Sequence, residues 1–235
     1  MDKIRWVIFG VICVLVLGGL VLLANKDKQD VSNINPHSII AGENGSIGDH
    51  VYGNKNAKVV LYEYGDFQCP SCGAAFPQIK TIKEKYKDQI AFVFRNFPLT
   101  SIHPNALAAS AAAEAAGQQG KFWEMHDTLY ENQNSWSSSS TSSRNDIFAQ
   151  YAQTIGLNMD QYNSDLTSKA VTEKIARDRA IGGKIKVNST PTFYLNDEIV
   201  DSETNSGVVN GDGSALMKKI DQKLKAAGVE PPKAE

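Results

Sequence analysis

Residues 58–77 constrain the fold of this chain most, because they place a strand, a turn and a helix in immediate succession. Residues 59–64 form an apolar run rich in β-branched and aromatic side chains, and the run is short enough to be one buried strand. A glycine and an aspartate end it, and an alanine-rich segment then predicts a helix. Cys69 and Cys72, spaced as C-x-x-C, fall at the predicted start of that helix.

A cysteine at the start of a helix is expected to be reactive. Only the thiolate attacks, and a free thiol with a pKa of about 8.5 is mostly protonated at neutral pH. Unpaired backbone N–H groups and the helix dipole should lower the pKa of Cys69. Cys72 lies one turn on, within reach of a disulfide with Cys69, and Pro70 suits a first turn that needs no N–H. We therefore predict a redox pair that cycles between dithiol and disulfide.

Two other interpretations of the C-x-x-C are a zinc site and a structural bridge. A structural zinc site needs four ligands, and the sequence has neither a second C-x-x-C nor a closely spaced histidine pair. A bridge closing so small a loop would remove little entropy from the unfolded chain. We expect no metal and no separate cofactor, because the cysteines themselves carry the electrons. The histidines lie far apart, at His37, His50, His103 and His126.

Composition narrows the function classes. A length of 235 residues allows one large domain or two small ones. A net charge of -2 predicts no nucleic-acid partner. Cys13 lies in an N-terminal apolar segment, so the rest of the chain has one cysteine pair and is not a scaffold held by several disulfides.

Residues 6–24 carry no charge and are long enough to cross a bilayer as a helix, after a short tail of residues 1–5. A cleaved signal peptide is the alternative, but the apolar core is long and no A-x-A-like site follows it. Lysine and arginine flank both ends, so charge barely sets the orientation. Because disulfides persist outside the cytoplasm, we expect a single-pass cell-membrane anchor with the catalytic domain on the extracytoplasmic side.

The remaining segments give an order of elements. Residues 25–47 predict a polar linker, with a short docking segment at 38–41 as the alternative. Two segments, the serine-rich 134–143 and the polar 201–212, are predicted as loops. His126, on a predicted helix over 121–131, is expected to be a packing residue. The folded domain is predicted over 48–228, with strands at 90–97, 187–195 and 198–200, a helical insertion at about 104–183, a last helix at 215–226 and a tail at 229–235.

Three motifs in this order resemble the DsbA-like thiol-disulfide oxidoreductases. They are the Tyr64, Asp66, Phe67, Cys69, Pro70 and Cys72 cluster, the segment 103–127, and the Ser-Thr-Pro-Thr-Phe sequence at 189–193. The resemblance covers roughly residues 48–228. It implies an α/β thioredoxin fold with a helical insertion, here preceded by one N-terminal transmembrane helix.

The resemblance also implies roles for single residues. Cys69 would be the exposed nucleophile, Cys72 the buried resolving thiol, and the two would form the Cys69–Cys72 disulfide. Pro191 matches the family's cis-proline beside the cysteine pair and leaves the Thr190 backbone free to pair with a substrate strand. Glu63 matches a buried acid that moves the proton of the resolving thiol, and burial would raise its pKa. A solvent-facing Glu63 is the alternative, because Glu63 and Tyr64 point to opposite sides of a strand.

One departure from the family bears on the direction of catalysis. The strongest oxidants carry Pro-His between the cysteines, whereas this chain has Pro70 and Ser71, which we expect to lie at the substrate-binding turn. Ser71 offers a hydroxyl and no charge, so Cys69 should be less acidic than in the Pro-His members.

The resulting functional expectation is an extracytoplasmic, membrane-tethered oxidoreductase that introduces disulfides into folding proteins through their thiols. A DsbB- or VKOR-like membrane partner would reoxidise it, as the resemblance implies. Two alternatives remain. One is a disulfide reductase or isomerase, and the other is a non-catalytic peptide-binding module with a structural disulfide.

Overall fold

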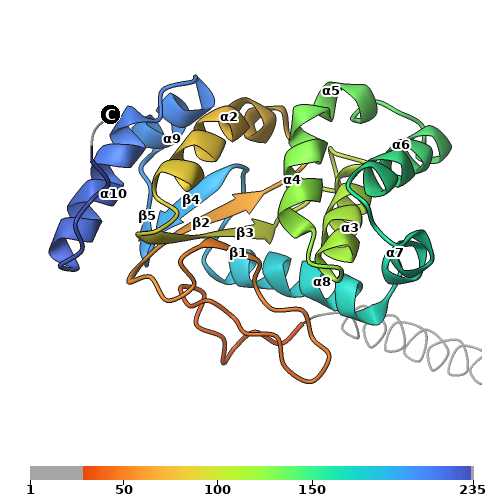
Figure 1. The fold of residues 1–235 in the computed structure, drawn as a ribbon, viewed down its shortest axis with the longest axis horizontal. Helices are drawn as coiled ribbons and strands as arrows, with labels where there is room; N and C mark the ends of the chain where they lie inside the picture. Colours follow the sequence, from red (N-terminus) through yellow and green to blue (C-terminus); the bar gives the residue numbers. More distant parts are fainter. Residues whose placement is uncertain (1–28, 234–235) are drawn as a thin grey trace, which may run out of the picture.

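The computed structural model describes residues 29–233 and shows an α/β fold built on one five-stranded sheet (Figure 1). The strand order is β1-β3-β2-β4-β5, in which β2 and β3 are parallel and the other neighbours are antiparallel. The strands are β1 (Val51–Gly53), β2 (Val59–Gly65), β3 (Ile90–Asn96), β4 (Thr192–Leu195) and β5 (Glu198–Ile199). The helices are α2 (Pro70–Lys85), α3 (Ala106–Gly117), α4 (Phe122–Glu131), α5 (Gln133–Trp136), α6 (Thr141–Thr154), α7 (Met159–Asp165), α8 (Lys169–Lys184), α9 (Ser202–Val209) and α10 (Ser214–Ala226).

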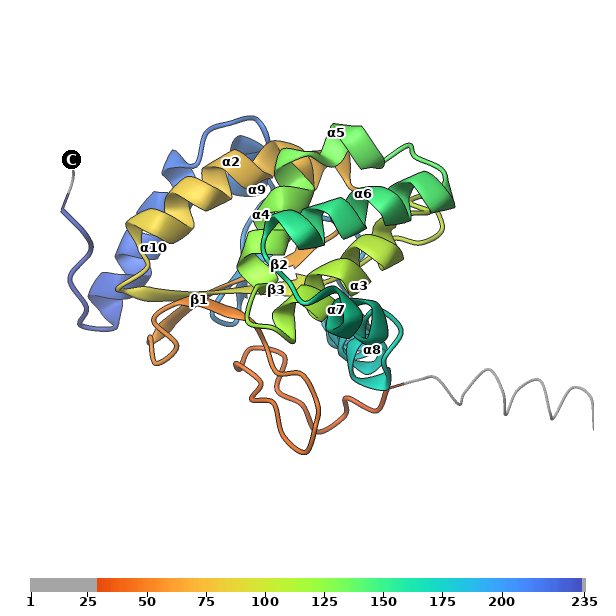
Figure 2. The same ribbon diagram turned by 45° about the vertical axis from the view of Figure 1, so that its right-hand side comes forward.

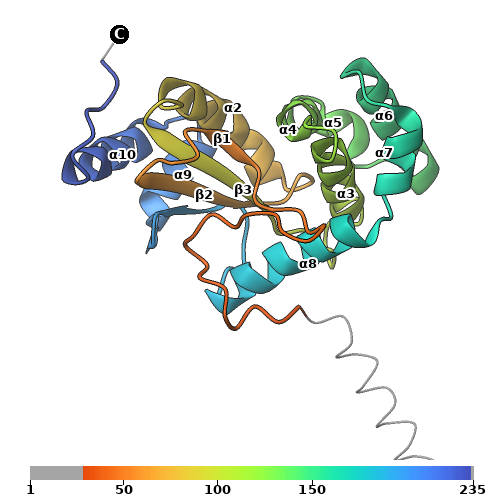
Figure 3. The same ribbon diagram turned by 60° about the horizontal axis from the view of Figure 1, so that its bottom comes forward.

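Helices cover both faces of the sheet, which explains why β2 is buried along almost its whole length. Helices α2, α9 and α10 lie on one face, and α8 and residues 29–50 lie on the other (Figures 1 and 3). Side chains alternate along the strand, so Leu61 packs toward α2 and α10 while Tyr62 packs toward α8. Because both faces are covered, neighbouring residues of β2 can all be buried.

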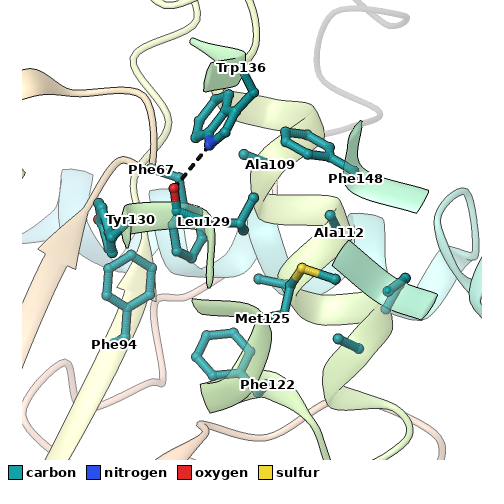
Figure 4. Close-up of a cluster of buried hydrophobic side chains, with 14 of the residues drawn as sticks. Phe67, Phe94, Ala109, Ala112, Phe122, Met125, Leu129, Tyr130, Trp136 and Phe148 are labelled. Carbon is teal, nitrogen blue, oxygen red and sulfur yellow. Dashed lines mark hydrogen bonds between the residues drawn. The ribbon is translucent and has the colours of Figure 1, made fainter. Parts of the chain in front are cut away.

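The helical insertion runs between β3 and β4 and contains α3 to α8, close to the predicted range of 104–183. Figure 2 shows α3, α4, α6 and α7 grouped at one end of the sheet. Their core joins the alanines of α3 to large side chains of α4, α5 and α6 (Figure 4). The same cluster includes Phe67, Cys69 and Cys72, so the insertion packs directly against the C-x-x-C turn.

Residues 29–47, predicted as part of a linker, instead lie against the sheet. The guanidinium of the buried Arg95 donates hydrogen bonds to the carbonyls of Pro36 and Ser38 and to the carboxylate of Asp49. Ile40 N donates to the same carboxylate at 3.0 Å. Val31 belongs to the buried cluster around Tyr62 and Tyr64, and Ile39 and Ile40 pack against it, so the docking segment expected as the alternative at 38–41 is present.

Two segments predicted as loops are helical, and both predictions are wrong. Residues 134–143 contain most of α5 and the start of α6, and Trp136 is fully buried. Residues 201–212 contain α9, where the carboxylate of Asp201 caps the helix by accepting from Thr204 N at 2.9 Å.

Within residues 29–233, none of the helices combines the length and the apolar character that crossing a bilayer requires. The anchor predicted at residues 6–24 lies outside the described residues.

Candidate active site

Cys69 occupies the position just before the first turn of α2, as the sequence predicts. Its backbone is extended (φ -66°, ψ 122°), and its carbonyl accepts the first helical hydrogen bond from Gly73 N at 3.1 Å. Pro70 is the first helical residue and is exposed. The Cys69 sulfur therefore lies beside backbone N–H groups that have no partner within the helix.

The two cysteines are free thiols in the structure and differ little in exposure. Cys69 retains 7% of its accessible surface and Cys72 retains 1%. The expected contrast between an exposed nucleophile and a buried resolving thiol is therefore a small one.

The turn before β4 completes the site. The peptide bond between Thr190 and Pro191 is cis, as predicted, and the Cys69 thiol donates a hydrogen bond to Thr190 O at 3.3 Å. A pocket of about 250 Å³ opens beside this contact. Ser71 lines it from α2, so the structure brings Ser71, Thr190 and Pro191 together, whereas Pro70 does not line the pocket. The other lining residues are Ser189 and, from α9 and its end, Asn205, Ser206, Val209 and Asn210.

The local environment separates the acidities of the two sulfurs. A hydrogen bond from the Cys72 thiol lowers the pKa of Cys69 to about 5, even though burial opposes the shift. Hydrogen bonds from the backbone N–H groups of Cys72 and Ser71 act in the same direction. Burial raises the pKa of Cys72 well above its ordinary value, and the neighbouring Cys69 and Glu63 add to this effect.

Glu63 is buried on β2, with 3% of its surface exposed, as the resemblance implies. Tyr64 is buried too, because it faces the α8 side of the sheet while Glu63 faces α2. Burial raises the pKa of Glu63 to about 8, opposed by Lys83 and reinforced by Cys69. The solvent-facing alternative for Glu63 is therefore wrong, and the carboxyl is largely protonated at neutral pH.

A second acid, Asp66, holds the active-site turn and was not assigned a role from the sequence. Its carboxylate is fully buried and accepts hydrogen bonds from Gln68 N and Leu99 N, each at 2.8 Å. It also bonds His103 Nδ1 at 2.7 Å. Asn105 N donates to Gln68 Oε1 at 2.6 Å. The segment 103–127 contributes to the family resemblance in the sequence. The structure adds that His103 and Asn105, at its start, contact the turn that precedes Cys69.

His126 packs among aromatic rings, as predicted for a packing residue. Its ring lies 4.9 Å from that of Phe94 and 5.1 Å from that of Tyr130, measured between centroids. Burial lowers its pKa to about 4, so the ring is neutral at pH 7. Among residues 29–233, no three histidine, cysteine or acidic side chains gather closely enough to bind a metal ion.

Comparison with known proteins identifies the family. Residues 45–210 match a family described as thioredoxin, and this range is more than half of the chain. The chain belongs to the thioredoxin family. In this thioredoxin-family protein, Cys69, Cys72, Thr190 and Pro191 all lie within the matched range.

Solved structures of related fold include DsbA-type proteins. A thioredoxin-like oxidoreductase from Silicibacter pomeroyi DSS-3 is 25% identical, with a TM-score of 0.61 over 78% of this chain and 94% of that one. The protein alpha-DsbA1 from Wolbachia pipientis is 23% identical, with a TM-score of 0.63 over 80% and 94%. Oxidised BdbD from Bacillus subtilis is 22% identical, with a TM-score of 0.62 over 80% and 99%. The last two similarities concern the fold alone.

The curated relatives with similar sequence are named as sodium/proton antiporters. The Na(+)/H(+) antiporter NhaA 1 of Salinispora arenicola is 39% identical over 148 residues, which are 63% of this chain and 22% of that protein. The chain thus spans about a fifth of the length of such relatives. The shared region supports common ancestry of this domain and says nothing about ion transport by the chain.

Proposed function

We propose that this protein is a thiol-disulfide oxidoreductase that introduces disulfides into folding proteins through Cys69 and Cys72. One observation carries the proposal. An acidic Cys69 and a weakly acidic Cys72 lie at the start of α2, next to Thr190 and Pro191. A low thiol pKa stabilises the reduced pair, and a stabilised reduced form makes the corresponding disulfide a stronger oxidant.

The oxidising reaction begins with the protein in its disulfide form. A substrate thiolate attacks Cys69 Sγ, a new S–S bond forms, and the bond to Cys72 breaks with its electron pair on the Cys72 sulfur. Because Cys72 is a strong base, it takes a proton, and the neutral Glu63 is the donor with a suitable pKa. The substrate is now held in a mixed disulfide with Cys69.

The second step releases the oxidised substrate. Another substrate thiolate attacks the substrate sulfur of the mixed disulfide, and Cys69 leaves as a thiolate. A thiolate with a pKa of about 5 is a good leaving group, so this step favours release. Two electrons have then passed from the substrate to the cysteine pair.

The pocket beside Pro191 suits an extended peptide. It offers the hydroxyls of Ser71, Ser189 and Ser206 and the amides of Asn205 and Asn210, with one aliphatic side chain, Val209. Uncharged polar groups can bond to a peptide backbone without selecting a charged side chain. We infer that the groove accepts substrates of varied sequence, as an enzyme acting on unfolded chains requires.

We further propose that residues 6–24 tether the domain to the cell membrane, with the catalytic domain on the extracytoplasmic side. The apolar length of this segment and the persistence of disulfides in that compartment support the proposal. A DsbB- or VKOR-like membrane protein would reoxidise the cysteines.

A disulfide reductase or isomerase is the second candidate, and Ser71 favours it. A histidine at this position would add a charge that stabilises the thiolate, and serine has none. Equilibration of the full chain with glutathione separates the candidates. A potential toward the oxidising end of the family range, near about -120 mV, supports the oxidase, and one near about -270 mV supports the reductase.

Trapping tests whether the protein is an enzyme at all. In Cys72→Ala the Cys69 thiolate can still attack a disulfide of a client or of the reoxidising partner, which forms the mixed disulfide and releases the other sulfur as a thiolate. Because no Cys72 thiol is present to displace the bound protein, these mixed disulfides through Cys69 should accumulate in intact cells and appear as adducts on non-reducing gels. Cys69→Ala is the matched control and should form none. If Cys72→Ala also forms none, the non-catalytic peptide-binding module is the better account.

A further inference from the structure

Gln133, the first residue of α5, reaches from the helical insertion to the turn that carries Cys69. Its side-chain Nε2 donates hydrogen bonds to Phe67 O at 2.7 Å and to Cys69 O at 2.9 Å. A side-chain amide nitrogen has two hydrogens, so both are used on these carbonyls. The two carbonyls flank Gln68, and the amide therefore clamps the turn on both sides of that residue.

The Cys69 carbonyl is also the one that opens α2. It accepts Gly73 N at 3.1 Å, the first hydrogen bond of the helix. Gln133 thus bonds the residue whose backbone defines the helix start and whose sulfur reacts. A change in this contact alters the position of Cys69 Sγ relative to the N–H groups of the first turn.

Gly73 leaves the space that Gln133 occupies. A Cβ built on Gly73 would lie 2.9 Å from Gln133 Cδ and closer still to Gln133 Oε1. These separations are shorter than carbon atoms tolerate, so an alanine would displace the amide from the carbonyls. The Gln133 side chain of α5 therefore explains why a residue without a Cβ stands at position 73.

The clamp stands on a rigid support. Trp136, at the end of α5, is fully buried, and its Nε1 donates to Leu129 O at 2.9 Å (Figure 4). Directly after α5, Ser137 O accepts from Gln68 Nε2 at 2.6 Å. Because α5 is fixed by packing and by these bonds, Gln133 can hold the turn in one geometry.

We propose that Gln133 is a positioning residue, through which the helical insertion holds the Cys69 turn and favours its sulfur as an anion. The proposal rests on the proposed function only in taking Cys69 as the reacting group. The amide hydrogens place the positive end of a dipole at the start of α2, with the same sign as the helix start itself. The titratable groups around the sulfur are Cys72 on α2, Glu63 on β2 and Tyr130 on α4, and the test variants keep all three.

The test is a pH titration of the Cys69 thiolate by its ultraviolet absorbance, in the reduced full chain. Gln133→Met keeps the volume and removes both donors, so the midpoint should rise by about half a pH unit, roughly a threefold change in the ionisation equilibrium. Gly73→Ala should raise it too, although alanine favours the helix. Gln119→Met is the control, because Gln119 bonds Asn158 O and N at 3.0 and 2.8 Å elsewhere in the insertion. It should leave the midpoint unchanged.

Unchanged midpoints in both test variants, with thermal unfolding like that of the wild type, overturn the proposal. An equal shift in the Gln119 control also overturns it, because the effect would then be a general one. If Gln133→Met does not fold, Gly73→Ala decides the question. A wild-type midpoint like that of free cysteine contradicts the proposed function, whereas a low wild-type midpoint with unchanged variants contradicts the role of Gln133 alone.

Discussion

Two buried acids on opposite sides of the sheet, Asp49 and Glu63, differ in their partners. On the face covered by α8 and residues 29–50, buried charges meet partners of opposite sign. Arg95 bonds Asp49 at 2.8 Å, and Lys174 lies 2.7 Å from Asp178. On the face covered by α2, Glu63 is buried and no hydrogen bond reaches its carboxyl from residues 29–233.

The pKa values of Asp49 and Glu63 follow from this difference. Burial alone would raise the pKa of Asp49, but Lys174 and Arg95 outweigh it and hold the value below the ordinary one. Burial prevails at Glu63 and raises its pKa to about 8. A buried charge costs less free energy when a group of opposite charge lies beside it. A buried acid that accepts no hydrogen bond keeps its proton to near neutral pH, where it can transfer that proton. We propose that the paired groups stabilise the fold and that Glu63 takes part in proton transfer.

Breaking a pair on the α8 face should have the largest effect on stability. Asp49→Asn leaves Arg95 and Lys174 buried with less opposite charge, and we expect a loss of about 3–5 kcal/mol in the free energy of unfolding. Urea unfolding measures it. Lys169→Gln, which removes an exposed pair with Glu173, is the control and should cost less than about 0.5 kcal/mol. Similar small losses in both variants would remove the contrast between the two acids.

Replacing Glu63 should have a smaller effect on stability, and of opposite sign. The folded protein holds the Glu63 proton more tightly than the unfolded chain, so this stabilisation is complete below about pH 4.5 and is lost as pH rises through about 8. Relative to wild type, Glu63→Gln should therefore gain about 2–3 kcal/mol between pH 5 and pH 7. Urea unfolding at the two pH values measures this gain.

Activity should change in the other direction. Disulfide transfer by Glu63→Gln should slow by roughly ten- to a hundredfold at neutral pH, because the amide cannot supply a proton to Cys72. A variant that is more stable and equally fast would show that Glu63 has no part in the transfer.

The smallest expected effect concerns the residue between the cysteines. Ser71→His adds a group that is partly cationic near neutral pH, so the pKa of Cys69 should fall further, by about one unit or less. The equilibrium with glutathione should shift toward the reduced pair. Ser206→His, which lines the same pocket from α9, is the control and should shift it less. Equal shifts would mean that any nearby charge acts alike, wherever it is placed.

Local patterns account for the parts of the fold that the sequence predicts well. The strand ending near Tyr64 and the helix after Cys69 follow from hydrophobic runs and turn residues within about 20 positions. The Thr190–Pro191 turn followed from a motif. The loop prediction over 201–212 failed because a single cap, Asp201, starts a short helix in polar sequence.

The remaining features depend on contacts between distant segments. Burial of both Glu63 and Tyr64 requires a sheet covered on two faces, which no single strand reveals. Gln133 reaches Cys69 only because the insertion folds back onto α2. The docking of residues 29–50 joins backbone carbonyls and the Asp49 carboxylate to Arg95 on β3, far away in the sequence. These contacts are therefore hidden from composition and periodicity.

The pH dependence of Cys69 alkylation tests the central claim most directly. The reduced full chain would be treated briefly with iodoacetamide at pH values from 3 to 10, and the modified cysteine would be read by peptide mass. The account predicts modification of Cys69 with a half-maximal rate near pH 5, and little modification of the buried Cys72. A half-maximal rate near the pKa of a free thiol, about 8.5, would contradict it.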